Sequence, residues 1–214
     1  MPATDETLPP DPVPGPAKPD LRRSALSCRA GVPAADRQTF AEQLAVRGVD
    51  LARRAMAHTV ALYWPIGDEA DPRLLLQALD YHEFTTLLPV TVGRGQPLVF
   101  RKWKWGQPLV EGPMRIPEPS PRLPEARPDM LFVPLAAFDR RGFRIGYGAG
   151  HYDATLQKLR ATRAVPAIGI GFACQEIGRV PHEPHDQPLD IIMTERETID
   201  CSIAFSDPPD RNDA

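Results

Sequence analysis

Short apolar runs alternate with helical patterns along most of this chain, and this alternation restricts its fold more than any other feature. The run TVALYW (59–64) is apolar and rich in β-branched and aromatic side chains, which indicates a strand. In the segment that follows, DPRLLLQALDY (71–81), the aspartate can cap a helix and the proline suits the first helical position. The pattern repeats, with strands expected at 85–90, 97–103, 130–135, 167–172 and 190–194, and helices expected from Leu21, at 35–57 and at 151–163. We therefore predict an α/β fold of three layers, an open and mostly parallel sheet with helices on both faces.

The length of the chain favours a single domain. Its 214 residues, 42% of them hydrophobic, are enough for one sizeable core. Residues 1–19 hold seven of the 26 prolines and almost no large apolar side chain, so they bury too little surface to offset the entropy of ordering. We predict a disordered tail over 1–19, one α/β domain over 20–203 and a flexible C-terminal tail over 204–214.

Charge and cysteine content argue against several classes of protein. A net charge of -3 gives no overall electrostatic reason to expect a nucleic acid or an anionic membrane as partner. The 3 cysteines are widely spaced and lack a CxxC, so they suggest neither a disulfide framework nor a zinc knuckle. No apolar run approaches the length of a membrane span, and the N-terminus is acidic and proline-rich where a secretory signal is basic and then apolar. We expect a monomeric, cytoplasmic protein.

A glycine-rich segment, GYGAG (146–150), directly precedes the helix expected at 151–163. Backbone N–H groups and the positive end of the helix dipole converge at a helix N-terminus, and glycines let the chain approach an anion closely. Arg144 can add charge-assisted hydrogen bonds to a phosphate. The GxGxG spacing fits neither the dinucleotide fingerprint nor the P-loop, so a plain glycine turn is an equally good interpretation of the glycines alone.

Asp153 favours the phosphate interpretation. A carboxylate in the first turn of the helix suggests that a cation accompanies the anion, and magnesium with oxygen ligands is the usual companion of a triphosphate. The alternative is that Asp153 only complements the helix dipole.

The order of several motifs resembles the 5-formyltetrahydrofolate cyclo-ligase family, also called methenyltetrahydrofolate synthetases, over about residues 18–201. That family shows a lysine and an arginine on its first helix, an acidic motif after an early strand, an IxEP turn, a long signature around GxGxG, and a tail of the form PxxxxDxx[LV]Dx[IV]xT. The matching landmarks here are Lys18 and Arg22, DEAD (68–71), LPV (88–90), IPEP (116–119), PLAAFDRRGFRIGYGAGHYD (134–153) and PHEPHDQPLDIIMT (181–194).

The resemblance implies an enzyme that uses ATP to close 5-formyltetrahydrofolate into 5,10-methenyltetrahydrofolate. The formamide oxygen is a poor leaving group until ATP phosphorylates it, after which N10 attacks the activated carbon and phosphate departs. Phosphoryl transfer requires mainly positioning and neutralised charge. The implied ligands are ATP, the reduced folate and Mg²⁺.

The resemblance also assigns roles to residues. Arg144 and Tyr152 are the expected catalytic residues, and Asp153 and Asp186 are the expected magnesium ligands. The expected ATP contacts are Lys18, Arg22, Arg144, Ile145, Gly146, Tyr147, Gly148, Ala149, Gly150, His151 and Tyr152. The expected folate contacts are Trp64, Glu69, Tyr147, Gly148, Ala149, Gly150 and His151. For Trp64, core packing is an equally good interpretation.

The chain departs from the family pattern at three positions. Ala149 stands where glycine is commoner, His151 where tyrosine or phenylalanine is usual, and Ala154 where many bacterial relatives have arginine. An alanine restricts the loop only if its φ is positive. His151 can donate a hydrogen bond to a phosphate or to the formyl group.

Three other interpretations stay open. The segment RKWKWG (101–106) interleaves cations with tryptophans, as single-strand nucleic-acid-binding surfaces do, although a half-buried edge strand is favoured. HEPHD (182–186) offers histidines and acids, but Pro181 and Pro184 disfavour the helix that would aim both histidines at one zinc ion. The third is a catalytically silent relative that binds nucleotide or folate.

Overall fold

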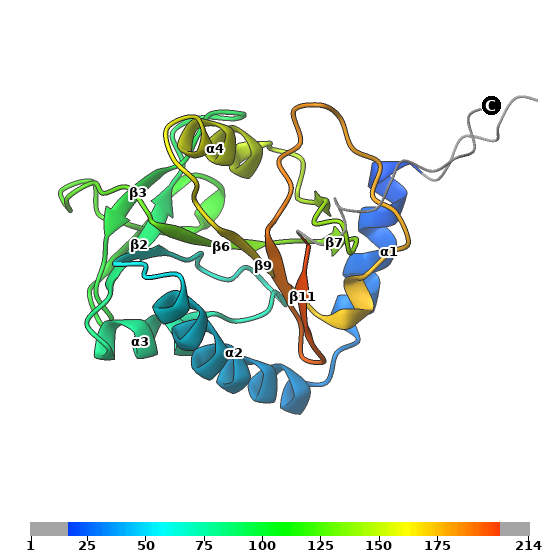
Figure 1. Cartoon of the computed structure of the whole chain (residues 1–214), viewed down its shortest axis with the longest axis horizontal. Helices are drawn as coiled ribbons and strands as arrows, with labels where there is room; N and C mark the ends of the chain where they lie inside the picture. Colours follow the sequence, from blue (N-terminus) through cyan, green and yellow to red (C-terminus); the bar gives the residue numbers. More distant parts are fainter. Residues whose placement is uncertain (1–16, 202–214) are drawn as a thin grey trace, which may run out of the picture.

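A computed structural model describes residues 17–201, which form a seven-stranded sheet between layers of helices (Figure 1). The five inner strands pair in parallel, and the strand at each edge is antiparallel to its neighbour. This confirms the predicted open, mostly parallel α/β sheet. From one edge to the other the strands are β11 (Thr198–Asp200), β10 (Ile191–Met193), β9 (Ala167–Ile170), β6 (Met130–Pro134), β1 (Thr59–Ala61), β2 (Thr85–Val90) and β3 (Val99–Lys102).

Helices cover both faces of the sheet, as predicted. In Figure 1, α2 (Ala34–Arg54) and α3 (Arg73–Tyr81) lie on one side of the strands and α4 (His151–Arg160) lies on the other. The start of α3 differs from the prediction by one residue: Pro72 is the N-cap residue, not the first helical residue, and it provides no side-chain cap, although the Asp71 carboxylate still accepts the Arg73 N–H at 2.9 Å. Helix α1 (Lys18–Ala30) lies beside the end of the sheet and packs against the 3₁₀ turn η2 (Ala173–Gln175).

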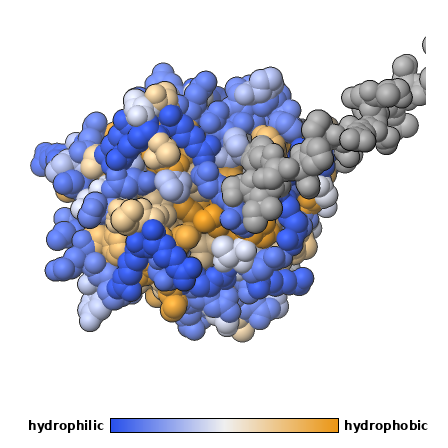
Figure 2. All heavy atoms as spheres, viewed as in Figure 1, coloured by the Kyte–Doolittle hydropathy of each residue, from blue (hydrophilic) through white to orange (hydrophobic). Residues whose placement is uncertain are grey.

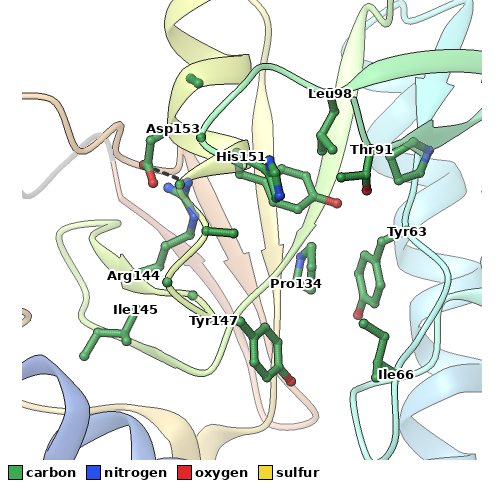
Figure 3. Close-up of a pocket in the computed structure, with 18 of the residues that line it drawn as sticks. Tyr63, Ile66, Thr91, Leu98, Pro134, Arg144, Ile145, Tyr147, His151 and Asp153 are labelled. Carbon is green, nitrogen blue, oxygen red and sulfur yellow. Dashed lines mark hydrogen bonds and ion pairs between the residues drawn. The ribbon is translucent and has the colours of Figure 1, made fainter. Parts of the chain in front are cut away.

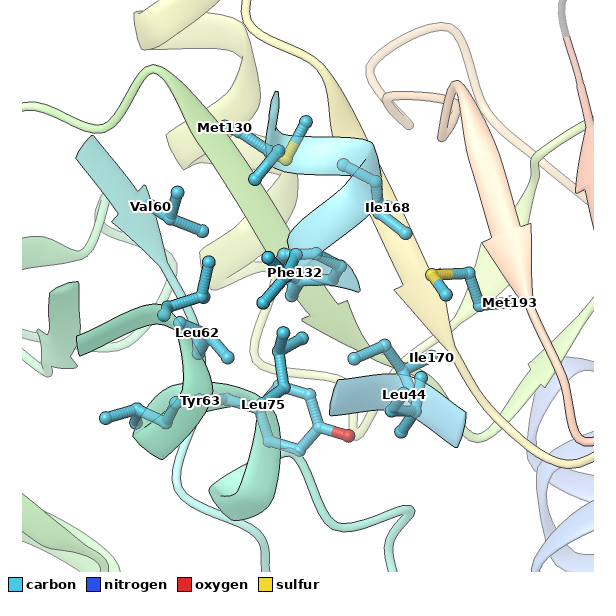
Figure 4. Close-up of a cluster of buried hydrophobic side chains, with 14 of the residues drawn as sticks. Leu44, Val60, Leu62, Tyr63, Leu75, Met130, Phe132, Ile168, Ile170 and Met193 are labelled. Carbon is cyan, nitrogen blue, oxygen red and sulfur yellow. The ribbon is translucent and has the colours of Figure 1, made fainter. Parts of the chain in front are cut away.

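The core is divided between the two faces because strand side chains alternate. Val60 and Phe132 belong to the cluster beneath α2 and α3 (Figure 4), whereas Ala61 and Val133, one residue further along each strand, belong to the cluster beneath α4. The inner strands β6 and β9 are buried on both faces, which explains why their sequences are continuously apolar.

Two short antiparallel hairpins, which the sequence pattern did not predict, lie outside the main sheet. One pairs β4 (Leu109–Glu111) with β5 (Pro117–Pro119) around the 3₁₀ turn η1 (Pro113–Arg115), and the other pairs β7 (Ala137–Phe138) with β8 (Arg144–Ile145). Prolines flank Glu118 in β5, and prolines lower the expectation of a strand.

The predicted N-terminal tail falls mostly outside the described residues, as does the C-terminal tail at 204–214. Helix α1 begins at Lys18, two residues before the predicted domain boundary. Pro19 is tolerated in its first turn because the N–H groups of a first turn have no partner within the helix. No helix within residues 17–201 is long and apolar enough to cross a membrane. Figure 2 shows apolar side chains reaching the surface mainly in a band across the middle of this face, between more polar regions.

The order of the strands fixes where a ligand can bind. From β1 the chain moves to β2 on one side, and later strands continue from β6 to β9 and β10 on the other. Loops leaving the carboxyl ends of β1 and β6 therefore diverge. In open α/β sheets the crevice at such a switch point is the usual ligand site.

Candidate functional site

A cavity of about 760 Å³ lies at this switch point (Figure 3). Its walls come from the loop after β1, from the segment after β6 that leads into α4, from the end of β2 with β5, and from the start of α1. A volume of this size suits a ligand of the size of a nucleotide or a folate.

The glycine loop forms the wall at the N-terminus of α4. Gly148 and Gly150 have φ of 90° and 71°, in the left-handed region that glycine tolerates, and Gly150 directly precedes the helix. Ala149 has no positive φ, so the alanine found there does not strain the loop. The first-turn N–H groups of α4 have no partners within the helix, which makes this wall suited to an anion.

Two cations from α1 reach the same wall. Arg22 donates from Nε to the carbonyl oxygen of Gly146 at 2.6 Å. Lys18 forms an ion pair with Asp186, with Nζ and Oδ2 2.8 Å apart. Helix α1 therefore brings two positive charges to the glycine loop from a distant part of the sequence.

Arg144 holds Asp153 and the segment around Gln187 together. It donates from Nη2 to Oδ1 of Asp153 at 2.8 Å and from Nη1 to the carbonyl oxygen of Gln187 at 2.5 Å, and the Gln187 N–H donates to the same Asp153 oxygen at 3.0 Å. The Arg144 side chain is 5% exposed. Burial lowers the pKa of its guanidinium, and the neighbouring Asp153 opposes that effect.

The opposite wall carries a buried carboxylate. Glu69 is 7% exposed and uses Oε2 to accept the Ile66 N–H at 2.9 Å. Its Oε1 is buried and accepts no hydrogen bond of normal geometry from the described residues, although the Tyr147 hydroxyl is near enough to act against the rise in pKa of this carboxyl. Burial raises the pKa of the Glu69 carboxyl above its ordinary value. An unmatched acceptor of this kind calls for a donor from a ligand.

Aromatic rings complete this wall. Trp64 lines the cavity and packs edge to face on Trp103 at 5.9 Å between centroids, so it serves both the pocket and the core. Arg29 donates to the Tyr147 hydroxyl at 2.9 Å. Burial and the nearby Glu69 raise the pKa of Tyr147 to about 12, and the same two causes raise the pKa of Tyr152 beyond its usual range. Both phenols therefore stay protonated at neutral pH and can donate hydrogen bonds.

The third wall contains a second buried carboxylate, Glu118, at the centre of β5. Its Oε1 accepts the Thr91 N–H at 3.0 Å. Glu118 stands inside the IPEP motif, but neither spacing nor hydrophobic pattern indicates that its side chain is buried in a cavity.

The cavity brings together every residue that the sequence analysis assigned to ATP, folate or magnesium. The resemblance supplied most of these residues, since no local pattern connects Lys18 with Asp186. The lining residues that sequence reasoning missed include Tyr63, Ile66, Thr91, Leu98, Glu118 and Pro134.

The structure does not support the nucleic-acid interpretation of RKWKWG. Trp103 is 3% exposed and Arg101 pairs with Glu125 at 2.8 Å, which leaves Trp105, 40% exposed, as the single ring of this segment at the surface and so no row of rings on which successive bases could stack. The segment belongs to β3 and the turn after it, at the edge of the sheet, as the favoured interpretation predicted.

The zinc interpretation of HEPHD also fails. Within residues 17–201 no cluster of three or more His, Cys, Asp or Glu side chains forms a metal site. His182 instead stacks on Phe143 at 3.8 Å between centroids.

Asp153 and Asp186 fit magnesium bound together with phosphate. Each uses a single oxygen in its hydrogen bonds; the other oxygen of Asp186 lies 3.7 Å from Nε2 of His185, and the other oxygen of Asp153 accepts no hydrogen bond from the described residues. Burial acts in the opposite direction, but hydrogen bonds from Lys18 and the Glu183 amide lower the pKa of Asp186 and keep it charged. A hexacoordinate Mg²⁺ commonly takes one or two carboxylates and completes its shell with phosphates and water.

The open sheet and the cavity at its switch point define an α/β protein with a site suited to a small ligand at the carboxyl edge of its strands. The model of the 5-formyltetrahydrofolate cyclo-ligase family matches residues 14–195. The chain belongs to that family of ligases and is therefore an enzyme, which confirms the resemblance seen in its motifs.

Individual relatives agree with this assignment. A 5-formyltetrahydrofolate cyclo-ligase from Mycolicibacterium smegmatis is 35% identical over 191 residues, covering 86% of this chain and 96% of the relative. One from Haemophilus influenzae is 29% identical over 179 residues, covering 81% and 95%. The NMR structure of Aquifex aeolicus 5,10-methenyltetrahydrofolate synthetase superposes with a TM-score of 0.75 at 25% identity, covering 92% of this chain and 99% of that one.

Proposed function

We propose that this enzyme converts 5-formyltetrahydrofolate to 5,10-methenyltetrahydrofolate, using ATP and releasing ADP and phosphate. The observation that carries the proposal is that one cavity holds both a glycine-rich helix N-terminus, which suits an anion, and a buried carboxylate oxygen, Oε1 of Glu69, that accepts no hydrogen bond of normal geometry from the described residues. The first suits the phosphates of ATP, and the second suits the N–H donors of a pterin.

The phosphate side of the cavity is equipped for phosphoryl transfer. The glycine loop supplies N–H donors, and Lys18 and Arg22 supply charge that offsets the triphosphate. Tyr152, protonated because its pKa is raised, can donate to the formyl oxygen or to the transferred group. Arg144 keeps Asp153 beside Gln187 and so fixes the shape of this wall.

The folate side of the cavity orients the other substrate. Oε1 of Glu69 accepts from the pterin amino and ring N–H groups, and Trp64 supplies an apolar face for the ring. The formyl group then lies between the pterin wall and the glycine loop. ATP phosphorylates the formyl oxygen, N10 attacks the carbon, and phosphate leaves.

Asp153 and Asp186 would hold Mg²⁺ in this enzyme. The ion supplies charge neutralisation for the triphosphate. The ion pair between Asp186 and Lys18 and that between Asp153 and Arg144 set both carboxylates on the phosphate side of the cavity.

The proposal is tested by following the absorbance of the methenyl chromophore with 5-formyltetrahydrofolate, ATP and magnesium. We expect product only when all three are present, with one ADP released per methenyl group formed. Binding of both ligands without product would contradict the proposal and identify a catalytically silent relative.

The magnesium assignment is tested with Asp153→Asn. The amide oxygen still accepts from Arg144 and Gln187, so the fold is retained, but the charge that binds the ion is lost. We expect magnesium-dependent turnover to fall by orders of magnitude and the melting temperature to fall slightly. Asp190→Asn is the matched control, because Asp190 also pairs with an arginine, Arg160, but lies outside the cavity. A fully active Asp153→Asn enzyme would show that Asp153 only complements the helix dipole.

A further inference from the structure

Glu118 is a buried carboxylate to which the steps described above give no role. It is 5% exposed, lines the cavity from β5, and is held through Oε1 by the Thr91 amide at 3.0 Å. Gly112 packs directly against it: a Cβ added there would lie 2.3 Å from the Glu118 Cδ and 2.5 Å from Oε2. The carboxylate is therefore fixed in position from two sides.

This carboxylate has no cationic partner. Within residues 17–201 Glu118 forms no ion pair, and Oε2 accepts no hydrogen bond. The cations that line the cavity are used elsewhere, since Lys18 pairs with Asp186, Arg144 pairs with Asp153, and Arg22 donates to the Gly146 carbonyl oxygen. Unlike Oε1 of Glu69, Oε2 of Glu118 is not enclosed by protein atoms, so a ligand in the cavity can present an N–H to it.

Glu118 is also tied to the phosphate side of the cavity. The loop that follows Thr91 binds the glycine loop, because the Gly95 N–H donates to the Ala149 carbonyl oxygen at 3.0 Å and His151 Nδ1 lies 3.1 Å from the Gln96 carbonyl oxygen. Thr91 and His151 both line the pocket drawn in Figure 3. Glu118 is thus anchored to the segment that adjoins the site of phosphoryl transfer.

The chemistry of the folate indicates which of its N–H groups faces Glu118; this step rests on the proposed function. A reduced 5-formylfolate carries N–H groups on the pterin edge, at N10 and on the glutamyl amide. The amide is flanked by carboxylates that would repel Glu118, and Glu69 already offers its unmatched oxygen to the pterin edge. N10 is the donor whose proton must leave when the ring closes.

We propose that Glu118 is the general base that takes the N10 proton during ring closure. After phosphorylation the formyl carbon is bonded to N5, to hydrogen and to the phosphorylated oxygen. The N10 lone pair forms the new N10–C bond, and the N10 proton passes to the Glu118 carboxylate. The C–O bond then breaks, its electron pair leaves with phosphate, and the N5–C–N10 methenyl cation remains. The proton on Glu118 is returned to phosphate or to water.

Glu118→Gln tests this role with little change in structure, because the amide oxygen still accepts from the Thr91 N–H. We expect kcat to fall by about 100-fold or more, the usual contribution of general base catalysis, while the Kd values for ATP and folate stay within a few fold. In single-turnover experiments, ADP should form ahead of the methenyl chromophore, since the variant is slowed after phosphoryl transfer. Glu69→Gln should give the opposite split, with weaker folate binding and no lag between ADP and product.

Two further variants separate catalysis from folding. Glu118→Ala leaves space for a small carboxylate, so added formate should restore part of its activity if it remains folded. Gly112→Ala displaces the Glu118 carboxylate without altering it and should lower kcat in the same direction. Gly178→Ala is the matched control, because a Cβ at Gly178 meets nothing within 4 Å and Gly178 does not line the cavity.

Several outcomes would overturn the assignment. Full activity of Glu118→Gln would exclude a base at this position, and a loss confined to folate affinity would make Glu118 a pterin ligand instead. Simultaneous formation of ADP and product in the slowed variant would also contradict it. If the natural enzyme forms no methenyl product, the proposed function is wrong, and this inference is wrong with it.

Discussion

The acidic side chains of the cavity differ in how each is held, and these differences separate their roles. Asp153 and Asp186 are paired with cations on the phosphate side. Glu69 and Glu118 are buried without a cation and are each held by a single backbone amide. The first pair suits a metal ion, whereas the second suits neutral N–H donors.

We expect Glu69→Gln to bind folate more weakly than the natural protein and to be more stable near neutral pH. Burial raises the pKa of the Glu69 carboxyl, so the folded protein favours its neutral form. The stability linked to that neutral form is present below the unfolded pKa, about 4.3, and is lost as pH rises through the higher folded pKa. A glutamine is neutral throughout. We therefore expect the variant to melt at a higher temperature than the natural protein near pH 7, and this difference to vanish toward about pH 4.

Thermal melts across this pH range, with folate titrations on the same samples, check the prediction. Glu42→Gln, on the exposed face of α2, is the control and should change neither quantity. An unchanged melting temperature at neutral pH would show that burial of the Glu69 charge is not unfavourable.

At the scale of elements, the junction between β8 and α4 depends on two glycines with positive φ. Gly150→Ala forces an L-residue into the left-handed region, which costs roughly 1–2 kcal/mol of unfolding free energy, and it reshapes the wall that faces the phosphates. We expect a matching loss in urea denaturation and a raised KM for ATP.

Gly146→Ala is the stability control for this prediction, because Gly146 lacks a positive φ and a Cβ there meets nothing within 4 Å. Its unfolding free energy should stay within about 0.5 kcal/mol of the natural protein. If both alanines lower the unfolding free energy equally, the positive φ of Gly150 is not the cause of the loss.

Long periodic elements were predictable from sequence, and short ones were not. The helices α2 and α4 and the inner strands follow directly from apolar spacing, although β1 ends at Ala61, three residues before the apolar run does. The hairpin of β4 and β5 has no such pattern, because prolines occupy both ends of β5 and tertiary contact with β2 decides its conformation. Glu118 was missed for the same reason.

At the scale of the whole molecule, the cavity joins two parts of the chain that the switch point separates. Trp64 and Glu69 follow β1, whereas the glycine loop follows β6, and α1 crosses between them through Arg29, which contacts Asp68 and Tyr147. The motifs could be found in the sequence, but their convergence could not. It depends on strand order, which no local pattern encodes.

A ligand that bridges these parts should stabilise the entire domain, since it binds only the folded arrangement. At a free concentration 100 times its Kd, a ligand adds about 2.7 kcal/mol to the unfolding free energy. For a domain of this size that corresponds to a rise of roughly 5–10 °C in melting temperature. We expect such a rise with 5-formyltetrahydrofolate and, separately, with ATP and magnesium.

Thermal melts of Glu69→Gln at the same absolute ligand concentrations should lose most of the folate shift and keep the nucleotide shift, because Glu69 lies on the pterin side alone. Loss of both shifts together would mean that Glu69 supports the shape of the whole cavity, and its assignment as a folate ligand would fail.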